Sequence, residues 1–519
     1  MELNAAQRDV VYDVTDPILL RAPAGTGKTS VLAQRVAHIL AAGLATGPEI
    51  LCLTFTNRAC KELKTRIFSE AKDNGLSVEV RTIHSFCYNL VREEAKASES
   101  MYSDFLILDD EDCQQIVKDL ARDMGAPLRV RALQSYLENE KKHRILPDLV
   151  LPKASDEAVQ SWLEEHGKAF AQAYERRLAA NHGADYSDLI TIAYELLQDE
   201  ACCQRWRERY KYIAVDEVQD TSEIEYTLLE RLFPGRVVLL CGDWYQTIYE
   251  WRGSDPIQLI QRFTREFHPE VYTFTENYRA TPLLLKAAEG YLRNAFSKDI
   301  PDERSSVSSV REGQGEPIVI HPAFETLDGE ARWIIQCIEF LVHKQKKLQE
   351  AEKGKICILC RNNAYNERLE EAFTRQLNQL KADGSGRWDF IRFLRIGEEK
   401  LYRKREVKDV LAALHLAVNP FDNNSARRLC LNWGRGIGEA TVKKILSPDY
   451  RKLGIGLSDF LRPDVLRYAD TYGTLLQALD EGRLTVFDVE STGTSTSTDE
   501  IVQLAAVTLN RDGQVTAGF

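Results

Sequence analysis

The feature that most constrains this chain is a loop of small residues between two apolar segments. Residues 18–20 are apolar and predict a short buried strand, and small residues follow up to Gly27. Lys28 and Thr29 then open a segment whose apolar residues recur at helical spacing. A strand, such a loop, Lys-Thr and a helix together predict a phosphate-binding loop, because backbone N–H groups and the helix N-terminus attract an anion.

The loop suggests a role for several of its residues. Gly25 and Gly27 allow backbone N–H groups to curl toward the phosphates. Lys28 is expected to reach the β- and γ-phosphates, and the Thr29 hydroxyl to bind Mg²⁺. Ala22 replaces the first glycine of the usual pattern. The alternative is an ordinary strand-to-helix turn. The candidate nucleotide-binding residues here are Ala22, Pro23, Ala24, Gly25, Thr26, Gly27, Lys28 and Thr29.

Composition indicates a folded protein of three or four domains, since the chain has 519 residues, 44% hydrophobic and 28% charged. The net charge of -12 argues against a broadly basic surface but allows a local basic channel. Cys357 and Cys360 lie in an apolar run, which predicts a buried strand rather than half a zinc site. Without a signal peptide or a run of about 20 apolar residues, we expect a cytoplasmic protein with no membrane partner.

The order of predicted elements indicates an α/β fold. Residues 1–86 and 185–275 alternate strands and helices, which predicts a parallel sheet covered by helices, and residues 87–184 form an inserted helical subdomain. The expected strands after the first are residues 50–53, 78–80, 212–215, 237–240 and 271–274.

The second half of the chain is expected to continue with further domains. Residues 276–410 predict a partial second α/β domain with strands at 317–321 and 355–359, and residues 411–480 are helical. A different segment, 481–519, begins with a strand at 484. The basic run 139–144, inside the first insertion, is open to two interpretations, a solvated helix end or a nucleic-acid contact.

Two carboxylates follow the strand at 212–215. Asp216 is expected to hold Mg²⁺, and Glu217 to orient and deprotonate an attacking water, as in an ATPase. The alternative is an acidic loop that caps the next helix. Arg279, which follows the strand at 271–274, is a candidate for stabilising charge on the γ-phosphate, or else for a surface salt bridge.

Exposed aromatic residues are expected near the same edge of the sheet. In the segment 242–253, Gln246 is placed to sense a γ-phosphate, while Tyr249 and Trp251 suit base stacking. Phe55 and His84 follow other strands, and ligands of open sheets bind at the carboxyl ends of the strands. For Phe55, packing in the core is an equal alternative.

Together these segments resemble the UvrD/Rep/PcrA family of superfamily 1 DNA helicases over about residues 1–445. The matching segments are 3–8, 22–29, 54–59, 82–86, 185–189, 216–220, 242–253, 277–279, 405–409, 419–420 and 435–438. The resemblance implies two RecA-like motor domains, each with a helical insertion. It also implies ATP- and Mg²⁺-dependent 3′→5′ movement on single-stranded DNA and at DNA junctions, in repair, recombination or defence.

The resemblance also implies roles for single residues. Gln7 and Arg35 would contact adenine, and Tyr278 would stack on it. The residues implied for phosphates, metal and water are Lys28, Thr29, Asp216, Glu217, Gln246 and Arg279. The candidate DNA-binding residues are Phe55, Thr56, Asn57, His84, Tyr249, Trp251 and Arg252.

The segment 487–493, followed by an apolar strand at 501–507, is similar to the first motif of DEDD exonucleases. Asp488 and Glu490 would then bind catalytic metals, although a turn with chance carboxylates is the alternative. Because the last motifs of both families are not found, we expect a fragment of a helicase–exonuclease fusion, with weak ATPase activity and an inactive nuclease.

Three functions therefore compete. The first is an ATP-dependent DNA helicase, and the second is a non-catalytic or weakly active remnant that binds ATP and DNA. The third is a phosphate-loop ATPase acting on RNA or protein, which explains Lys28 and Glu217 but not Tyr249 and Trp251. The protein partners are not predicted.

Overall fold

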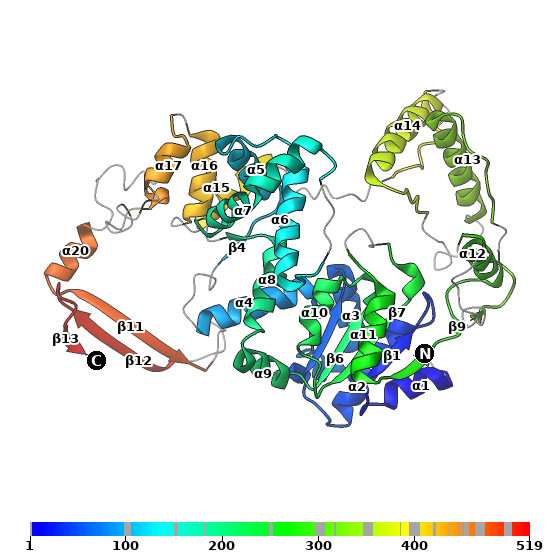
Figure 1. Ribbon diagram of the computed structural model, residues 1–519, viewed down its shortest axis with the longest axis horizontal. Helices are drawn as coiled ribbons and strands as arrows, with labels where there is room; N and C mark the ends of the chain where they lie inside the picture. The colour runs from blue at the N-terminus through cyan, green and yellow to red at the C-terminus, as the bar shows by residue number, and fades with distance from the viewer. Residues whose placement is uncertain are drawn as a thin grey trace. The chain divides into compact units, whose positions relative to one another are not determined.

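The structure is a computed structural model (Figure 1). The chain divides into two compact units, residues 1–320 and 321–519, and each is described by itself. The described residues are 3–97, 105–149, 154–180, 183–248, 253–295, 307–315, 318–345, 356–382, 384, 386–393, 405–418, 422–434, 436–445, 447, 450, 456–461, 473–492 and 501–518. Within them, no helix is long and apolar enough to cross a membrane.

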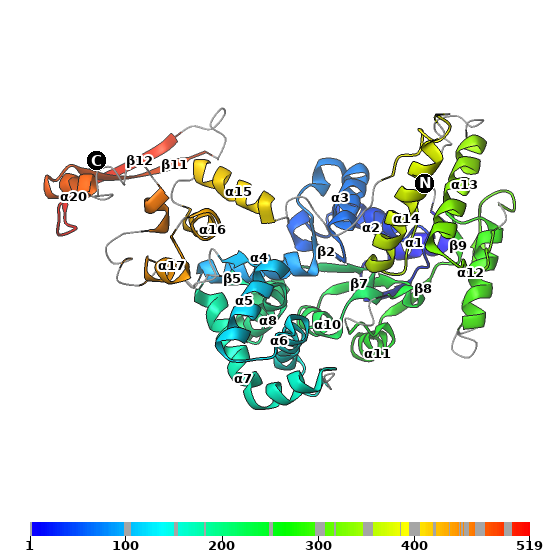
Figure 2. The same ribbon diagram turned by 90° about the horizontal axis from the view of Figure 1, so that it is seen from above.

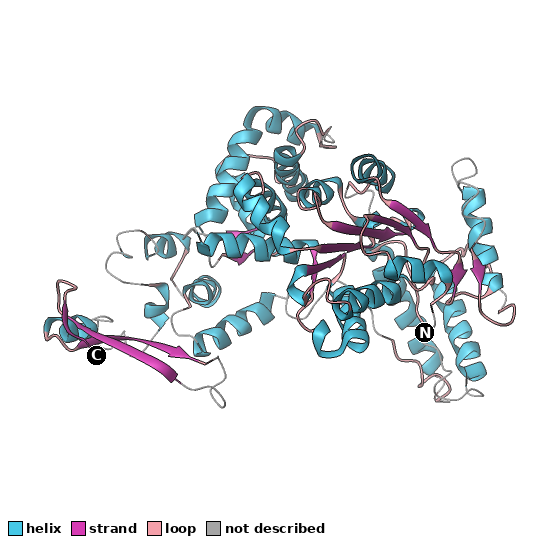
Figure 3. Cartoon of the chain, turned by 90° about the horizontal axis from the view of Figure 1, so that it is seen from below, coloured by secondary structure: helices cyan, strands magenta, loops and turns pink. Residues whose placement is uncertain are grey.

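The first unit is built on a sheet whose strands are drawn in magenta among helices in Figure 3. Its six strands have the order β3-β2-β6-β7-β1-β8. Every neighbouring pair in it is parallel, so the carboxyl ends of all six strands lie at one edge. This confirms the predicted α/β class with a parallel central sheet. The strands are β1 (Ile18–Arg21), β2 (Ile50–Thr54), β3 (Glu79–Thr82), β6 (Tyr212–Asp216), β7 (Val237–Gly242) and β8 (Glu270–Thr273).

Helices cover both faces of this sheet, which explains why its central strands are apolar without alternation. Leu51 and Leu53 of β2 face one hydrophobic cluster, and Ile50 and Cys52 face the other. On one face lie α1 (Ala5–Tyr12), α2 (Lys28–Ala41) and α3 (Asn57–Ala71) (Figure 2). On the other lie α4 (Ile83–Ala97), α8 (Tyr186–Leu196), α9 (Glu200–Arg209), α10 (Glu223–Glu230) and α11 (Pro256–Phe267).

The helical insertion has a hydrophobic core of its own, as expected for a subdomain. It consists of β4 (Leu106–Ile107), α5 (Asp110–Asp123), α6 (Val130–Ile145), α7 (Glu157–Ala180) and β5 (Gly183–Ala184). Because α4 packs into the core of the sheet and runs past residue 86, the insertion begins after α4 rather than at residue 87.

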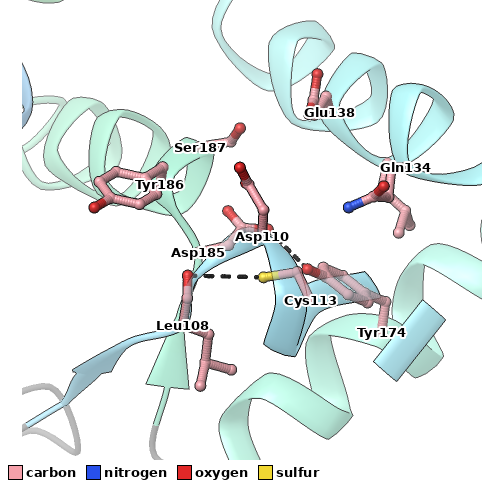
Figure 4. A pocket seen from close by; sticks show the side chains of 10 residues that line it. Leu108, Asp110, Cys113, Gln134, Glu138, Tyr174, Asp185, Tyr186 and Ser187 are labelled. Carbon is pink, nitrogen blue, oxygen red and sulfur yellow. Dashed lines mark hydrogen bonds between the residues drawn. The ribbon is translucent and has the colours of Figure 1, made fainter. Parts of the chain in front are cut away.

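Within the basic run 139–144, Lys141 is internal. Its side chain is buried, and its Nζ lies 2.6 Å from carboxylate oxygens of both Asp185 and Asp188. The Tyr174 hydroxyl donates to Asp185 at 3.0 Å beside a small pocket (Figure 4). Burial acts to raise the pKa of Asp185, but Lys141 outweighs burial and holds that pKa below its ordinary value. Neither interpretation of the run therefore applies to Lys141, because its ammonium group is buried between two carboxylates and is neither solvated nor exposed to a nucleic acid.

The first unit ends with β9 (Glu276–Asn277), α12 (Pro282–Ala295) and β10 (Ser308–Ser309). In the second unit, α13 (Leu327–Gln345) packs on α14 (Asn363–Lys381). A separate cluster joins α15 (Arg405–Val418), α16 (Asn423–Trp433), α17 (Glu439–Ile445) and η9 (Leu457–Leu461). After α20 (Gly473–Asp480), an antiparallel sheet contains β11 (Leu484–Ser491), β12 (Ile501–Leu509) and β13 (Val515–Gly518).

Two strand predictions in residues 276–410 are wrong for the residues that the structure describes. Residues 318–321 and 356–359 are not in strands, and the side chains of Val319 and Leu359 are 75% and 89% exposed. Cys357 is exposed as well, rather than buried. An apolar segment becomes a strand only where a neighbour pairs with its backbone, and local composition does not reveal that neighbour.

A lysine substitution tests the internal role of Lys141. Lys141→Ala leaves two buried carboxylates without their cation, a loss that typically costs about 3–5 kcal/mol of unfolding free energy. We expect a lower urea midpoint for Lys141→Ala. The neighbouring Lys142→Ala, which removes a partly exposed lysine, changes the unfolding free energy by about 0.5 kcal/mol or less. Equal midpoints for the two variants would refute this role.

Candidate nucleotide-binding site

One pocket of about 250 Å³ lies at the carboxyl edge of the six-stranded sheet. The order of the strands explains its composition, because β1 lies between β7 and β8, and β6 follows β7. Residues from four predicted motifs therefore meet there. The lining is Ala22, Pro23, Ala24, Gly25, Gly27, Lys28, Thr29, Ser30, Arg66, Glu217, Asp243, Gln246, Tyr278 and Arg279.

The loop between β1 and α2 has the conformation that anion binding requires. Gly25 and Gly27 have φ angles of +86° and +88°, in the left-handed region that glycine adopts readily. Gly27 is the N-cap of α2, and no side chain among the described residues caps this end. The N-terminus of α2 therefore remains able to bind an anion.

The segment after β8 packs directly against this loop. The Tyr278 backbone N–H donates to the Gly25 carbonyl at 2.8 Å, and the Asn277 side-chain amide donates to the Ala24 carbonyl at 2.8 Å. A Cβ at Gly25 would lie 2.8 Å from the Arg279 Cβ, closer than real Cβ atoms approach. Gly25 is thus needed for close packing as well as for its backbone angle.

Lys28 forms the charged centre of the pocket. Its Nζ lies 3.3 Å from Asp216 Oδ1 and 2.5 Å from Glu217 Oε2. Burial acts to lower the pKa of Lys28, but Asp216 and Glu217 outweigh burial and raise it above the ordinary value. Lys28 is therefore a permanent cation in this structure, and it reaches both carboxylates from the start of α2.

The two carboxylates differ in their environments. Burial raises the pKa of Asp216, which is enclosed between β6 and β7. Burial also acts to raise the pKa of Glu217, but Lys28 and the Gln219 amide hold it below the ordinary value. Glu217 is consequently ionised at neutral pH, which is the state that a general base requires.

The residues implied for adenine are only partly in the pocket. Tyr278 lines it, and its hydroxyl donates to Glu276 at 2.6 Å. Gln7 is buried and donates to the Thr26 carbonyl at 3.0 Å. The lining does not include Gln7 within the described residues, so its contact with adenine stays a prediction.

Arg35 is also buried, and it mainly holds α1 in place. It donates to the backbone carbonyls of Val10, at 2.6 Å, and Asp13. Burial lowers the pKa of Arg35 to about 10. In the described part of the chain its Nη2 has no hydrogen-bond partner, and the pocket lining does not include Arg35. Its contact with adenine stays a prediction.

The candidate DNA residues lie on the same edge but toward β3. Phe55, Thr56 and Asn57 follow β2, and His84 follows β3, so β6 and β7 separate both sites from the β1 loop. Thr56 also caps α3, because its hydroxyl accepts from the Ala59 backbone N–H at 3.1 Å. Tyr249, Trp251 and Arg252 lie outside the described residues.

The exonuclease interpretation of the C-terminal segment stays a prediction, although the strands expected there are present. The predicted strands at 484 and 501–507 are confirmed as β11 and β12. Asp488 and Glu490 are exposed on β11 and, two residues apart in a strand, share one face. No group of three or more His, Cys, Asp and Glu suited to a metal occurs within the described residues.

The sequence assigned no role to four residues that line or contact the site, namely Ser30, Arg66, Gln219 and Asp243. Asp243 and Gln219 lie inside segments recognised as motifs, but only their neighbours were given roles. Asp243 lines the pocket, and buried Gln219 contacts Glu217. Arg66 reaches the pocket from α3 and donates to the Ser30 hydroxyl at 2.5 Å. No sequence motif marks Arg66, and only the packing of α3 on α2 brings it there.

Comparisons with known proteins are consistent with this geometry. The UvrD/REP helicase N-terminal domain family matches residues 3–268, and the UvrD-like helicase C-terminal domain family matches residues 272–509. The second match extends through residues 481–509, which were expected to begin an exonuclease segment.

Individual relatives are similar over most of this chain. The ATP-dependent DNA helicase UvrD1 of Mycobacterium tuberculosis (strain ATCC 25618 / H37Rv) is 30% identical over 479 residues, covering 88% of this chain and 58% of the relative. The ATP-dependent DNA helicase PcrA of Staphylococcus aureus (strain NCTC 8325 / PS 47) is 29% identical over 456 residues, covering 85% and 57%. This chain thus spans under two thirds of the length of these relatives.

Two glycine substitutions separate close packing from backbone strain. Gly25→Ala and Gly43→Ala both place alanine at positive φ, which costs about 1–2 kcal/mol. Only at Gly25 does the new methyl group collide with Arg279, since nothing lies within 4 Å of a Cβ at Gly43. We expect Gly25→Ala to weaken binding of a fluorescent ATP analogue about tenfold or more, with little change for Gly43→Ala. Equal affinities would contradict the packing argument.

The pH dependence of stability tests the Lys28 cluster. In Lys28→Ala, Asp216 is buried without a cation, so its folded-state pKa lies further above the unfolded value of 3.8. The folded state then binds more protons than the unfolded state, and stability falls as pH rises above about 4. We expect the melting temperature of Lys28→Ala, relative to the unsubstituted chain, to be lower at pH 8 than at pH 5.

Lys64→Ala, which removes an exposed lysine, is the control and should show no such trend. A deficit in Lys28→Ala that is equal at both pH values would mean that Asp216 does not depend on Lys28.

Proposed function

This chain belongs to the UvrD/REP helicases, and we propose that it is an ATP-driven motor that moves 3′→5′ along single-stranded DNA. The observation that carries the ATP-driven part of the proposal is the contact of Lys28 with Glu217, 2.5 Å apart, in the pocket that the β1 loop lines. A residue that binds the phosphates and a general base that activates water must both reach the same nucleotide. Lys28 and Glu217 meet this requirement, because both line one pocket.

We propose that the triphosphate of ATP binds between the β1 loop and Glu217. Lys28 would exchange its two carboxylate contacts for the β- and γ-phosphates. Arg279, which also lines the pocket, would balance charge on the γ-phosphate. Tyr278 would stack on adenine, and its hydroxyl bond to Glu276 would hold the ring in place. Glu217, ionised beside Lys28, would accept the proton of the attacking water.

The donor set also suits a magnesium ion. Asp216 provides a carboxylate and Thr29 a hydroxyl, and magnesium prefers oxygen ligands. When bound, the ion would neutralise part of the phosphate charge. The buried Asp216 carboxylate, now balanced by Lys28, is the residue that would hold it.

We propose that DNA bases bind at the edge of the sheet near His84 and Phe55. Contacts of Tyr249, Trp251 and Arg252 with DNA, in residues that the structure does not describe, belong to the same proposal. The half-buried Phe55 ring suits stacking, which is worth about 1–3 kcal/mol per base. Relatives named as ATP-dependent DNA helicases support DNA over RNA or protein as the track. Engagement of junctions and a cytoplasmic location belong to the same proposal. An exonuclease role for Asp488 and Glu490 stays a prediction.

The test is ATP hydrolysis with and without single-stranded DNA. We expect DNA to stimulate turnover in the unsubstituted chain and Glu217→Gln to reduce it about 10²-fold or more, because a general base contributes about 10²–10⁴-fold. Glu70→Gln removes an exposed carboxylate of α3 and should hydrolyse ATP normally. Turnover that survives both Lys28→Ala and Glu217→Gln would remove the site assignment. Binding of ATP and DNA without turnover would favour the remnant.

A further inference from the structure

A groove of about 1040 Å³ lies on the helical insertion, and it shares no lining residue with the nucleotide pocket among the residues described. One wall is a face of α6 on which the lining residues recur every three or four positions, and the other is the segment before α7 with the first turns of that helix. The residues that carry the argument are Arg129, Arg131, Tyr136, Asn139, Glu140 and Asp156. The proposed nucleotide and DNA sites make no use of this groove.

The side chain of Asn139 marks this groove as a binding site. It is 8% exposed, lines the groove, and has no hydrogen-bond partner among the residues that the structure describes. An amide offers both donors and an acceptor, and a buried amide that is left unpaired is unfavourable. Lys141, two residues later on the same helix, is by contrast paired with Asp185 and Asp188. A ligand in the groove that pairs with Asn139 would supply the missing hydrogen bonds.

The charged residues of the groove leave one cation without a partner. Arg129 donates to the Asp156 carboxylate at 2.9 Å, so these two charges balance each other. Burial and the neighbouring Glu140 raise the pKa of Tyr136, which places Glu140 beside that phenol. Arg131 is exposed, and within the described part of the chain it forms no ion pair. Its guanidinium is therefore available to an anionic group of a ligand.

The length and charges of the groove fit a short peptide better than a nucleic acid. From Ala132 to His143 the lining face of α6 runs about 16 Å, which is the length of about five residues of extended chain. A peptide backbone presents a donor and an acceptor at each residue, and these match the two ends of an amide side chain. Phosphate groups only accept, and the carboxylates of Glu140 and Asp156 in the same groove would repel them.

We propose that this groove binds a short extended peptide of another protein, one that carries a carboxylate for Arg131 beside an apolar side chain. Val130, Tyr136 and Leu163 provide the apolar surface, and Asn139 would pair with the peptide backbone. The helical insertion then serves to recruit a partner protein. The inference goes beyond the proposed function and does not depend on it, because it requires neither ATP nor DNA.

The experiment selects ligands from a phage-displayed library of random heptapeptides, with the full chain as bait. We expect enrichment of peptides in which an acidic residue adjoins apolar residues. The enriched peptides are then synthesised with a fluorescent label, and their affinities are measured by anisotropy. Arg131→Glu and Asn139→Leu should each weaken binding about tenfold or more, because each removes a hydrogen-bonding partner of the peptide. Arg122→Glu, which reverses an exposed arginine of α5 outside the groove, is the control and should change the affinity by about twofold or less.

The stability of Asn139→Leu separates a binding role from a structural one. Leucine has a similar shape and removes an unpaired buried polar group, so we expect the urea midpoint to stay the same or to rise while peptide binding is lost. A lower midpoint would mean that the amide already has a structural role in the folded chain, and it would overturn the inference.

The remaining outcomes are equally distinct. No enrichment of peptides, or enriched peptides that bind Arg131→Glu and Asn139→Leu as tightly as the unsubstituted chain, would overturn the inference. Enrichment of basic peptides would overturn it as well, and so would a fluorescent duplex DNA that displaces the peptide. The proposed function is tested separately, since Arg131→Glu should hydrolyse ATP without DNA at the rate of the unsubstituted chain. Loss of peptide binding with normal hydrolysis, or the reverse, shows which of the two has failed.

Discussion

The interaction on which the rest of the structure depends is the contact of Lys28 with Asp216 and Glu217. One cation from the first turn of α2 balances two carboxylates at the end of β6, in a place where burial opposes all three charges. A triphosphate with a metal ion carries the same pattern of opposite charges. The charges of Lys28, Asp216 and Glu217 therefore balance one another in this structure. A bound nucleotide with its metal ion would replace these contacts.

The parallel sheet is what makes this contact possible. Because each neighbouring pair of strands runs the same way, residues far apart in sequence, such as Gly25, Glu217 and Tyr278, arrive at one edge. The same edge continues to Phe55 and His84 beyond β6. Gln219 and Asp243 bridge β6 and β7 between these regions. The candidate nucleotide and DNA residues therefore lie along one edge of the sheet.

Much of this edge was predictable, because strand, loop and helix signals are local in the sequence. The strands before residue 275, the β1 loop and the meeting of Lys28 with Glu217 are confirmed. The inward position of Lys141 was not predictable, since its partners Asp185 and Asp188 lie more than forty residues later. The two strands expected at 317–321 and 355–359 failed for the same reason, because strand pairing is not local. Arg66 and Gln219 needed the packing of neighbouring elements to be found.

The most direct measurement is a crystal structure of the chain with magnesium and a non-hydrolysable ATP analogue. If the account is right, the triphosphate lies on the β1 loop, and Lys28 Nζ has left its 2.5 Å contact with Glu217 for a phosphate oxygen. A nucleotide bound elsewhere, with the Lys28–Glu217 contact intact, would contradict the account at its centre.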